Sequence, residues 1–234
     1  MNLILLFAED FVAPDRAQLR GRRLTHVTGV HRAAVGDSLV VGLAGGRIGA
    51  GVVTRLDDVL ELQVTLDRDP PPPLPLTLVL ALPRPKVLNR VIASATSLGV
   101  KRIFLINAWR VEKSYWKSPR LSEENLQLQC VLGLEQARDT VLPAIETRRL
   151  FRPFVEDELP AIAGESLSLV AHPIATSPCP RAVTRSVTLA IGPEGGFIEQ
   201  EIESLRRIGF EPVSLGDRVL RVETAVAALI ARLF

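Results

Sequence analysis

The chain has 234 residues, of which 47% are hydrophobic and 23% charged, and its formal net charge is +2. These values are ordinary for a globular protein that is large enough to bury a core. So small a positive charge permits a nucleic-acid partner without requiring one.

The sequence shows no clear targeting signal and no pattern of metal-binding residues. The apolar run Leu3–Phe7 is too short for a signal peptide, and no apolar run is long enough to span a membrane. Cys130 and Cys179 lie far apart and match no metal or redox spacing. The three histidines do not form a metal-binding pattern either. We therefore expect a cytoplasmic protein with no membrane partner and no metal.

The first part of the chain, residues 1–70, is predicted to be a small β-barrel. Short strands are expected at residues 2–7, 38–43, 48–56 and 59–66, with glycine- or aspartate-containing turns between the later ones. Between the first two strands lies a basic stretch, and its arginines are candidates for RNA binding: Arg20, Arg22, Arg23 and Arg32. The alternative is a solvated loop with a short helix.

A proline run at 70–73 separates this region from the rest of the chain. Four consecutive prolines form a stiff, extended spacer. We place the domain boundary here, and the second domain at residues 74–234.

From residue 76 onward, apolar strands alternate with amphipathic helices. Strands are predicted at 76–82, 102–106, 145–150 and 167–171, and helices at 86–98, after Ser122 and at 155–163. This alternation predicts an α/β domain with a largely parallel sheet covered on both faces. Ligands of such sheets bind beyond the carboxyl ends of the strands.

Two glycine-containing loops follow strand-like runs near the end of the chain, at 192–197 and 215–221. Glycines let backbone approach a ligand closely. Glu194 and the early glutamates of the next helix already satisfy a helix N-terminus and would repel a pyrophosphate. A nucleoside without phosphates suits these loops better. The alternative is that the glycines only serve tight turns.

The two loop sequences, IGPEGGF and LGDRVLRVETA, resemble the paired C-terminal motifs of the ribosomal RNA uridine-N3 methyltransferase family (RsmE) in the SPOUT superfamily. Leu98-Gly99-Val100 and Glu135-Gln136-Ala137-Arg138 also match, and the N-terminal region resembles that family's PUA-like RNA-binding barrel. The resemblance implies an S-adenosylmethionine-dependent enzyme that methylates N3 of a uridine in 16S ribosomal RNA, with S-adenosylhomocysteine as product. It also implies a C-terminal trefoil knot, a homodimer and the small ribosomal subunit as partner.

The residues expected by this resemblance to line the cofactor site are Gly192, Gly195, Gly196, Leu215, Gly216, Leu220, Arg221, Thr224 and Ala225. The chain departs from the family pattern at Ser97, at Arg84-Pro85-Lys86 and at Asp217. The first two departures bear on the RNA substrate or the dimer contact more than on the cofactor.

Methylation at N3 requires loss of the uridine proton, and a nearby cation stabilises the developing anion. We expect Arg221, or Arg32 from the first domain, to supply that cation; no residue stands out as a general base. Arg110 begins a second basic stretch that also contains Trp109, Tyr115 and Trp116. These aromatic side chains either stack on unpaired bases or pack across a dimer.

Two other functions remain open. One is a SPOUT methyltransferase acting on another RNA position, and the other is a non-catalytic RNA-binding factor for ribosome assembly.

Overall fold

The computed structural model describes residues 2–234. Its contacts divide the chain into two units, residues 1–72 with 131–142, and residues 73–130 with 143–234. The segment 131–142 therefore packs with the N-terminal region, although the chain around it belongs to the second unit. Among residues 2–234, no helix combines the length and the apolar character needed to cross a bilayer.

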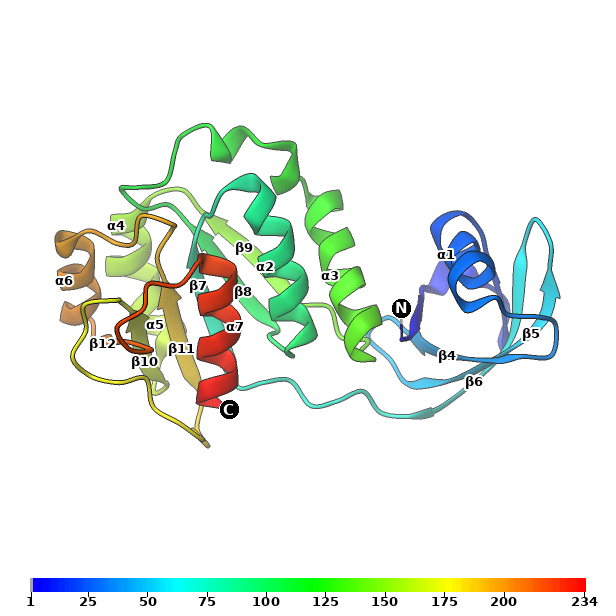
Figure 1. Ribbon diagram of the computed structural model, residues 1–234. Helices are drawn as coiled ribbons and strands as arrows, with labels where there is room; N and C mark the ends of the chain where they lie inside the picture. The colour runs from blue at the N-terminus through cyan, green and yellow to red at the C-terminus, as the bar shows by residue number, and fades with distance from the viewer. Residues whose placement is uncertain (1) are drawn as a thin grey trace. The chain divides into compact units, whose positions relative to one another are not determined.

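Unit 1 is a curled, mixed six-stranded sheet in the order β1-β4-β5-β6-β3-β2 (Figure 1). Its strands are β1 (Ile4–Leu6), β2 (Phe11–Ala13), β3 (Arg16–Leu19), β4 (Ser38–Leu43), β5 (Ile48–Leu56) and β6 (Leu60–Arg68). Only the β1–β4 pair is parallel. The basic stretch folds into α1 (Gly21–His26) and a π-helical turn (Val27–His31).

Strand β1 is buried on both faces, which explains its unbroken apolar sequence. Ile4 and Leu6 point into the core of the curled sheet. Leu3 and Leu5 pack on the opposite side against Val131 and Leu134. Val131 and Leu134 lie in the last part of helix α3 (Glu123–Ala137), which thus completes the hydrophobic core of unit 1.

Unit 2 contains a parallel six-stranded sheet in the order β12-β10-β11-β7-β8-β9 (Figure 1). The strands are β7 (Leu76–Ala81), β8 (Arg102–Ile106), β9 (Ala144–Arg148), β10 (Leu167–Ala171), β11 (Val187–Ile191) and β12 (Glu211–Val213). The helices are α2 (Pro85–Ser97), α3 (Glu123–Ala137), α4 (Phe151–Pro153), α5 (Leu159–Ala163), α6 (Glu199–Arg207) and α7 (Val222–Leu233). This arrangement confirms the predicted fold class.

Helix boundaries follow local chemistry. Pro85 occupies the first turn of α2, where its fixed φ suits a helix start. Gly99 follows that helix with a φ of +89°, and Gly209 follows α6 with a φ of +92°. Both glycines end their helices in the left-handed conformation that other residues adopt at a cost.

The connection between β10 and β11, residues 172–186, contacts the last part of the chain, residues 214–233, near both of its ends. Cys179 N–H donates to the Ser214 carbonyl at 2.8 Å. Val183 N–H donates to the Leu233 carbonyl at 2.6 Å, and Arg232 Nε to the Cys179 carbonyl at 2.7 Å. A threaded C-terminal segment requires such contacts, and the trefoil knot itself stays a prediction.

Candidate functional site

A cavity of about 1090 Å³ lies at the carboxyl ends of β10, β11 and β12. The last residues of these neighbouring strands, Ala171, Ile191 and Val213, all line it. The cavity therefore occupies the position at which open parallel sheets bind ligands.

The structure brings most of the predicted cofactor residues together on this cavity: Gly192, Gly195, Gly196, Leu215, Gly216, Leu220, Arg221 and Ala225. Thr224 is the exception, because it is exposed in the first turn of α7 and does not line the cavity. Two loops that are far apart in the sequence thus form one site.

The first loop is tightly folded around its glycines. A Cβ on Gly192 would lie 2.7 Å from the backbone nitrogen of Phe197, so no other residue fits without moving the backbone. Gly196 has a φ of +71°, and its N–H donates to the Pro193 carbonyl at 2.7 Å. These glycines are required by the loop itself, and they also leave its backbone accessible from the cavity.

The carboxylates of this region hold loops together. Glu194 Oε1 accepts the backbone N–H of Arg84 at 2.9 Å. Glu201, which is buried, accepts the backbone N–H of Ile198 at 2.9 Å and that of Trp109 at 2.7 Å. The N-terminus of α6 thus has its own carboxylate, which agrees with the expectation that a phosphate does not bind there.

Arg110 contacts the same loop. Its guanidinium donates a hydrogen bond to the Gly195 carbonyl, and its side chain lies where a Cβ on Gly195 would be. The structure therefore places this predicted RNA-binding residue against the first glycine loop.

Arg221 stands at the start of α7 and is exposed on the cavity wall. Its guanidinium makes no hydrogen bond or ion pair with the described residues, so it is available to a ligand. Glu223, two residues later, pairs instead with Arg90 at 3.4 Å.

Four basic residues also line the cavity: Arg84, Lys86, Arg90 and Arg120. Arg120 belongs to the second basic stretch, whereas Arg84, Lys86 and Arg90 were not predicted as site residues. Pro85 marks the start of α2 soon after β7, and this position at a strand's carboxyl end was the signal that could have identified Arg84, Lys86 and Arg90. Tyr115 also lines the cavity and donates its hydroxyl to Glu112 at 3.1 Å. Burial and the hydrogen bond to Glu112 raise the pKa of Tyr115.

Two of the candidate arginines of unit 1 are engaged in ion pairs with buried carboxylates. Arg22 contacts Glu135 at 2.9 Å, and Arg23 contacts Asp10 at 2.6 Å. These guanidinium groups compensate buried charge, so their first role is structural. Arg32 is exposed, has a φ of +52° and forms no ion pair with residues in the described range.

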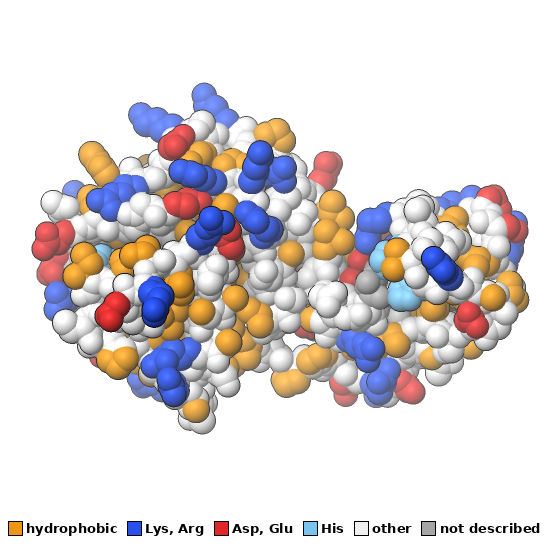
Figure 2. Space-filling model, in the orientation of Figure 1, with side chains coloured by type: hydrophobic (Ala, Val, Ile, Leu, Met, Phe, Trp, Pro, Cys, Tyr) orange, Lys and Arg blue, Asp and Glu red, His pale blue; other side chains and the backbone are white. Residues whose placement is uncertain are grey.

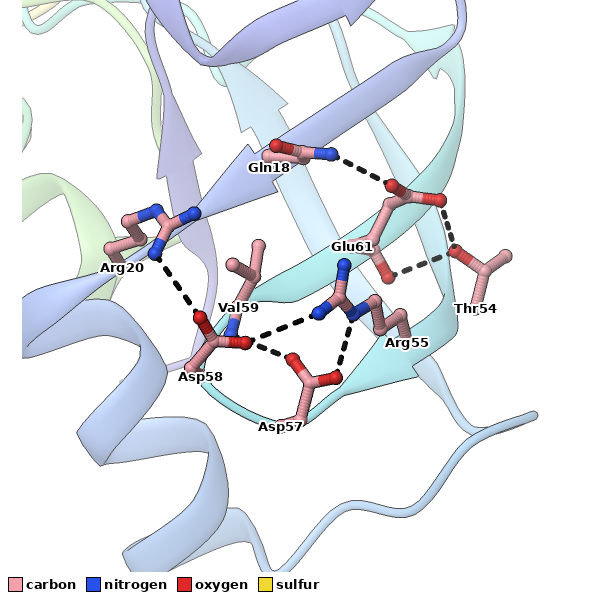
Figure 3. A network of polar contacts seen from close by, with 8 residues as sticks. All are labelled: Gln18, Arg20, Thr54, Arg55, Asp57, Asp58, Val59 and Glu61. Carbon is pink, nitrogen blue, oxygen red and sulfur yellow. Dashed lines mark hydrogen bonds and ion pairs between the residues drawn. The ribbon is translucent and has the colours of Figure 1, made fainter.

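Arg20 belongs to a network at the turn between β5 and β6 (Figure 3). It lies 3.6 Å from Asp58, which also contacts Arg55 at 3.2 Å. The hydrogen bond from Arg55 holds the pKa of Asp57 well below its usual range. The exposed charges of this turn largely neutralise one another.

Within residues 2–234, no group of three side chains has the composition and spacing of a metal site.

Comparisons with known proteins agree with the motifs. The family described as "RNA methyltransferase domain" matches residues 70–234. The ribosomal RNA small subunit methyltransferase E of Treponema pallidum is 31% identical, over 99% of this chain and 90% of that protein. The protein of the same name from Synechocystis is 29% identical, over 98% of this chain and 76% of that protein.

Among solved structures, a ribosomal RNA small subunit methyltransferase E from Neisseria gonorrhoeae, bound to S-adenosyl methionine, superimposes with a TM-score of 0.76. It is 22% identical, and the match covers 99% of this chain and 95% of that chain. This likeness confirms the fold of both units. From the family match and the full-length relatives, the chain belongs to the RNA methyltransferase domain family, in its ribosomal RNA small subunit methyltransferase E group.

Proposed function

We propose that this protein transfers a methyl group from S-adenosylmethionine to N3 of a uridine in small-subunit ribosomal RNA, in the cytoplasm, where that RNA is assembled. The observation that carries the proposal is the convergence of two glycine loops on one cavity at the strand ends. The names of the full-length relatives support the substrate class, and the cofactor of the Neisseria protein supports the methyl donor.

The residues of the cavity fit a nucleoside-containing cofactor. The cavity volume of about 1090 Å³ exceeds what such a cofactor needs, so a nucleotide of the substrate has room beside the cofactor. Leu215, Leu220 and Leu229 supply apolar surface for a base. The glycines at 192, 195 and 196 admit close backbone approach. When bound, S-adenosylmethionine supplies the methyl group.

The protein's own part in the reaction is to orient the uracil, exclude water and stabilise charge. Arg221 lies on the cavity wall, and its guanidinium has no hydrogen bond or ion pair with the described residues. It is placed to stabilise the uracil anion that forms when the N3 proton passes to solvent water, before N3 attacks the methyl carbon. The carboxylates of Glu194 and Glu201 accept hydrogen bonds from backbone N–H groups, so neither residue is assigned as a base. The basic wall that includes Arg84, Lys86 and Arg120 would hold phosphates of the substrate.

We further propose that the protein acts as a homodimer through the outer side of α7. Leu215, Leu220, Ala228 and Phe234 line a groove beside this helix, and Val219 is 78% exposed in the adjoining loop. A second copy would bury these apolar side chains next to the cavity. Light scattering at micromolar concentration tests this: a dimer is expected, and a monomer would contradict it.

The experiment for the function is mass mapping of small-subunit ribosomal RNA from a strain that lacks the gene. One uridine-N3 methyl group should disappear, and purified protein with S-adenosylmethionine should restore it in vitro. Loss of a methyl group at another position would assign a different RNA target. Unchanged methylation together with no cofactor binding would favour the non-catalytic assembly factor.

A further inference from the structure

The loop between β8 and α3, residues 107–122, carries both tryptophans of the chain. Trp109 is 79% exposed, which is unusual for so large an apolar side chain. Its backbone is nevertheless fixed, because its N–H donates to the buried Glu201 carboxylate at 2.7 Å. The indole is therefore presented to solvent by a firmly held backbone.

Trp116 is held in the same loop by its ring nitrogen. Its Nε1–H donates to Asn107 Oδ1 at 2.9 Å, and Asn107 N–H donates to the Arg148 carbonyl at 2.9 Å. The guanidinium of Arg149 lies over the Trp116 ring, 5.5 Å from its centroid. This cation–π contact places a positive charge beside the loop.

The charge of the loop is positive and largely uncompensated. Lys113, Lys117 and Arg120 are exposed and form no ion pair with the part of the chain that the structure describes. Glu112 is the acidic residue among them, and it accepts hydrogen bonds from Tyr115 and Ser114. Figure 2 shows Lys and Arg side chains standing out along the upper edge of unit 2, over this loop.

The loop is continuous with the cavity. Tyr115 and Arg120 line the cavity, whereas Trp116, next to Tyr115 in the chain, contacts Arg149. Arg110, next to Trp109, is bonded to the first glycine loop. The tryptophan-bearing surface thus begins at the cavity wall and extends outward from it.

We propose that Trp109, Trp116, Lys113, Lys117 and Arg149 form a stacking surface for unpaired nucleotides that flank the target base. One base stacks on Trp109, and the cations bind the phosphates on either side. This inference rests on the proposed function for its RNA substrate.

Charge favours RNA over a second copy of the chain as the occupant. In a two-fold contact the same patch meets itself, so that Lys113, Lys117 and Arg149 would face their own equivalents, with Glu112 as the single carboxylate of the loop to offset them. Phosphates neutralise the same cations.

Intrinsic fluorescence tests the proposal directly, because the only tryptophans of the chain lie in this loop. A short, unpaired oligouridylate should quench the emission of the wild-type protein. Trp109→Ala should weaken binding about 5- to 150-fold, the range for loss of one stacked base. Trp109→Phe should restore most of the affinity, and Leu128→Ala, which removes another exposed apolar side chain of unit 2, should leave it unchanged.

Calorimetry with S-adenosylmethionine keeps this test separate from that of the proposed function. Trp109→Ala should bind the cofactor as the wild type does. If Trp109→Ala binds RNA as tightly as the wild type, the proposal of a stacking surface is overturned. If that variant also changes from dimer to monomer, Trp109 belongs to a subunit contact instead. If no form binds the cofactor but Trp109→Ala still loses RNA, the proposed function fails while the surface stands.

Discussion

Arg110 donates from its guanidinium to the Gly195 carbonyl and occupies the space in which a Cβ on Gly195 would lie, with its Cδ 2.8 Å from that position. In this arrangement of the loops after β8 and β11, a side chain at residue 195 has no room unless Arg110 moves. This contact joins the predicted cofactor loop to the predicted RNA-binding loop.

Gly195→Ala should displace Arg110 and weaken S-adenosylmethionine binding about tenfold, because the loop backbone moves with its partner. In Arg110→Ala the same glycine substitution should cost much less, since the obstructing side chain is gone. Calorimetry on the four members of this double-mutant cycle measures the coupling. Additive effects would mean that the contact does not position the loop.

Glu201→Gln should destabilise the protein by about 1–3 kcal/mol, because the amide retains one acceptor oxygen where the carboxylate serves two backbone N–H groups. The midpoint of urea unfolding measures this. Glu203→Gln is the matched control on the exposed face of α6 and should change little. Equal shifts in the two variants would contradict the role given to Glu201.

Arg23→Ala should mainly reduce stability, by roughly 2–3 kcal/mol, because it leaves Asp10 buried without its cation. The loss is smaller than for a fully buried pair, since 19% of the Arg23 side chain is exposed. Arg32→Ala should instead leave the unfolding midpoint unchanged and weaken RNA binding, with a smaller salt dependence. A stable Arg23→Ala with reduced RNA affinity would return that residue to the RNA interface.

Arg221→Ala should lower kcat by about 10²–10³-fold, the cost of removing one group that stabilises a developing anion, with a much smaller change in cofactor affinity. Arg221→Lys should recover part of the rate. Single-turnover methylation and calorimetry separate the two quantities. Arg218→Ala, on the same cavity wall, is the control and should have a smaller effect. An unchanged kcat in Arg221→Ala would remove the assignment.

The two thiols should make stability depend on pH on the alkaline side. Burial raises the pKa of Cys130 and of Cys179 above the ordinary value of 9.0. The thiolate is therefore favoured in the unfolded chain, so this contribution to stability is complete below pH 9.0 and is lost as the pH rises from there through the folded pKa. The double variant Cys130→Ala, Cys179→Ala should show a shallower alkaline loss of the unfolding midpoint. In the wild type, Ellman's reagent should react slowly at pH 8 until denaturant is added.

The parallel sheet was predictable because its strands are apolar and its helices have clear periodicity. Strands β2 and β3 were not predicted, since Phe11–Ala13 and Arg16–Leu19 are too short to display alternation. The packing of residues 131–142 against β1 was missed for another reason. Val131 and Leu134 form an ordinary apolar helix face, which does not indicate the unit that will cover it.

The candidate site could likewise be predicted from the sequence only in part. Glycine loops after strands could be assigned to a cavity because their position and residue type limit what they do. The basic stretch near α1 could not be interpreted so well, because composition does not reveal that Arg22 meets Glu135 or that Arg23 meets Asp10. Ion pairs between residues distant in the chain depend on the tertiary fold.

Calorimetric titration of the purified protein with S-adenosylmethionine tests the central claim, that the two glycine loops form a cofactor site. We expect saturable binding in the wild type. We expect a large loss in Gly192→Ala, where the new Cβ would lie 2.7 Å from the Phe197 nitrogen. Gly29→Ala, whose Cβ would have no atom within 4 Å and whose backbone is outside the left-handed region, should bind as the wild type does. Absence of binding at millimolar cofactor in the folded wild-type protein would contradict the account.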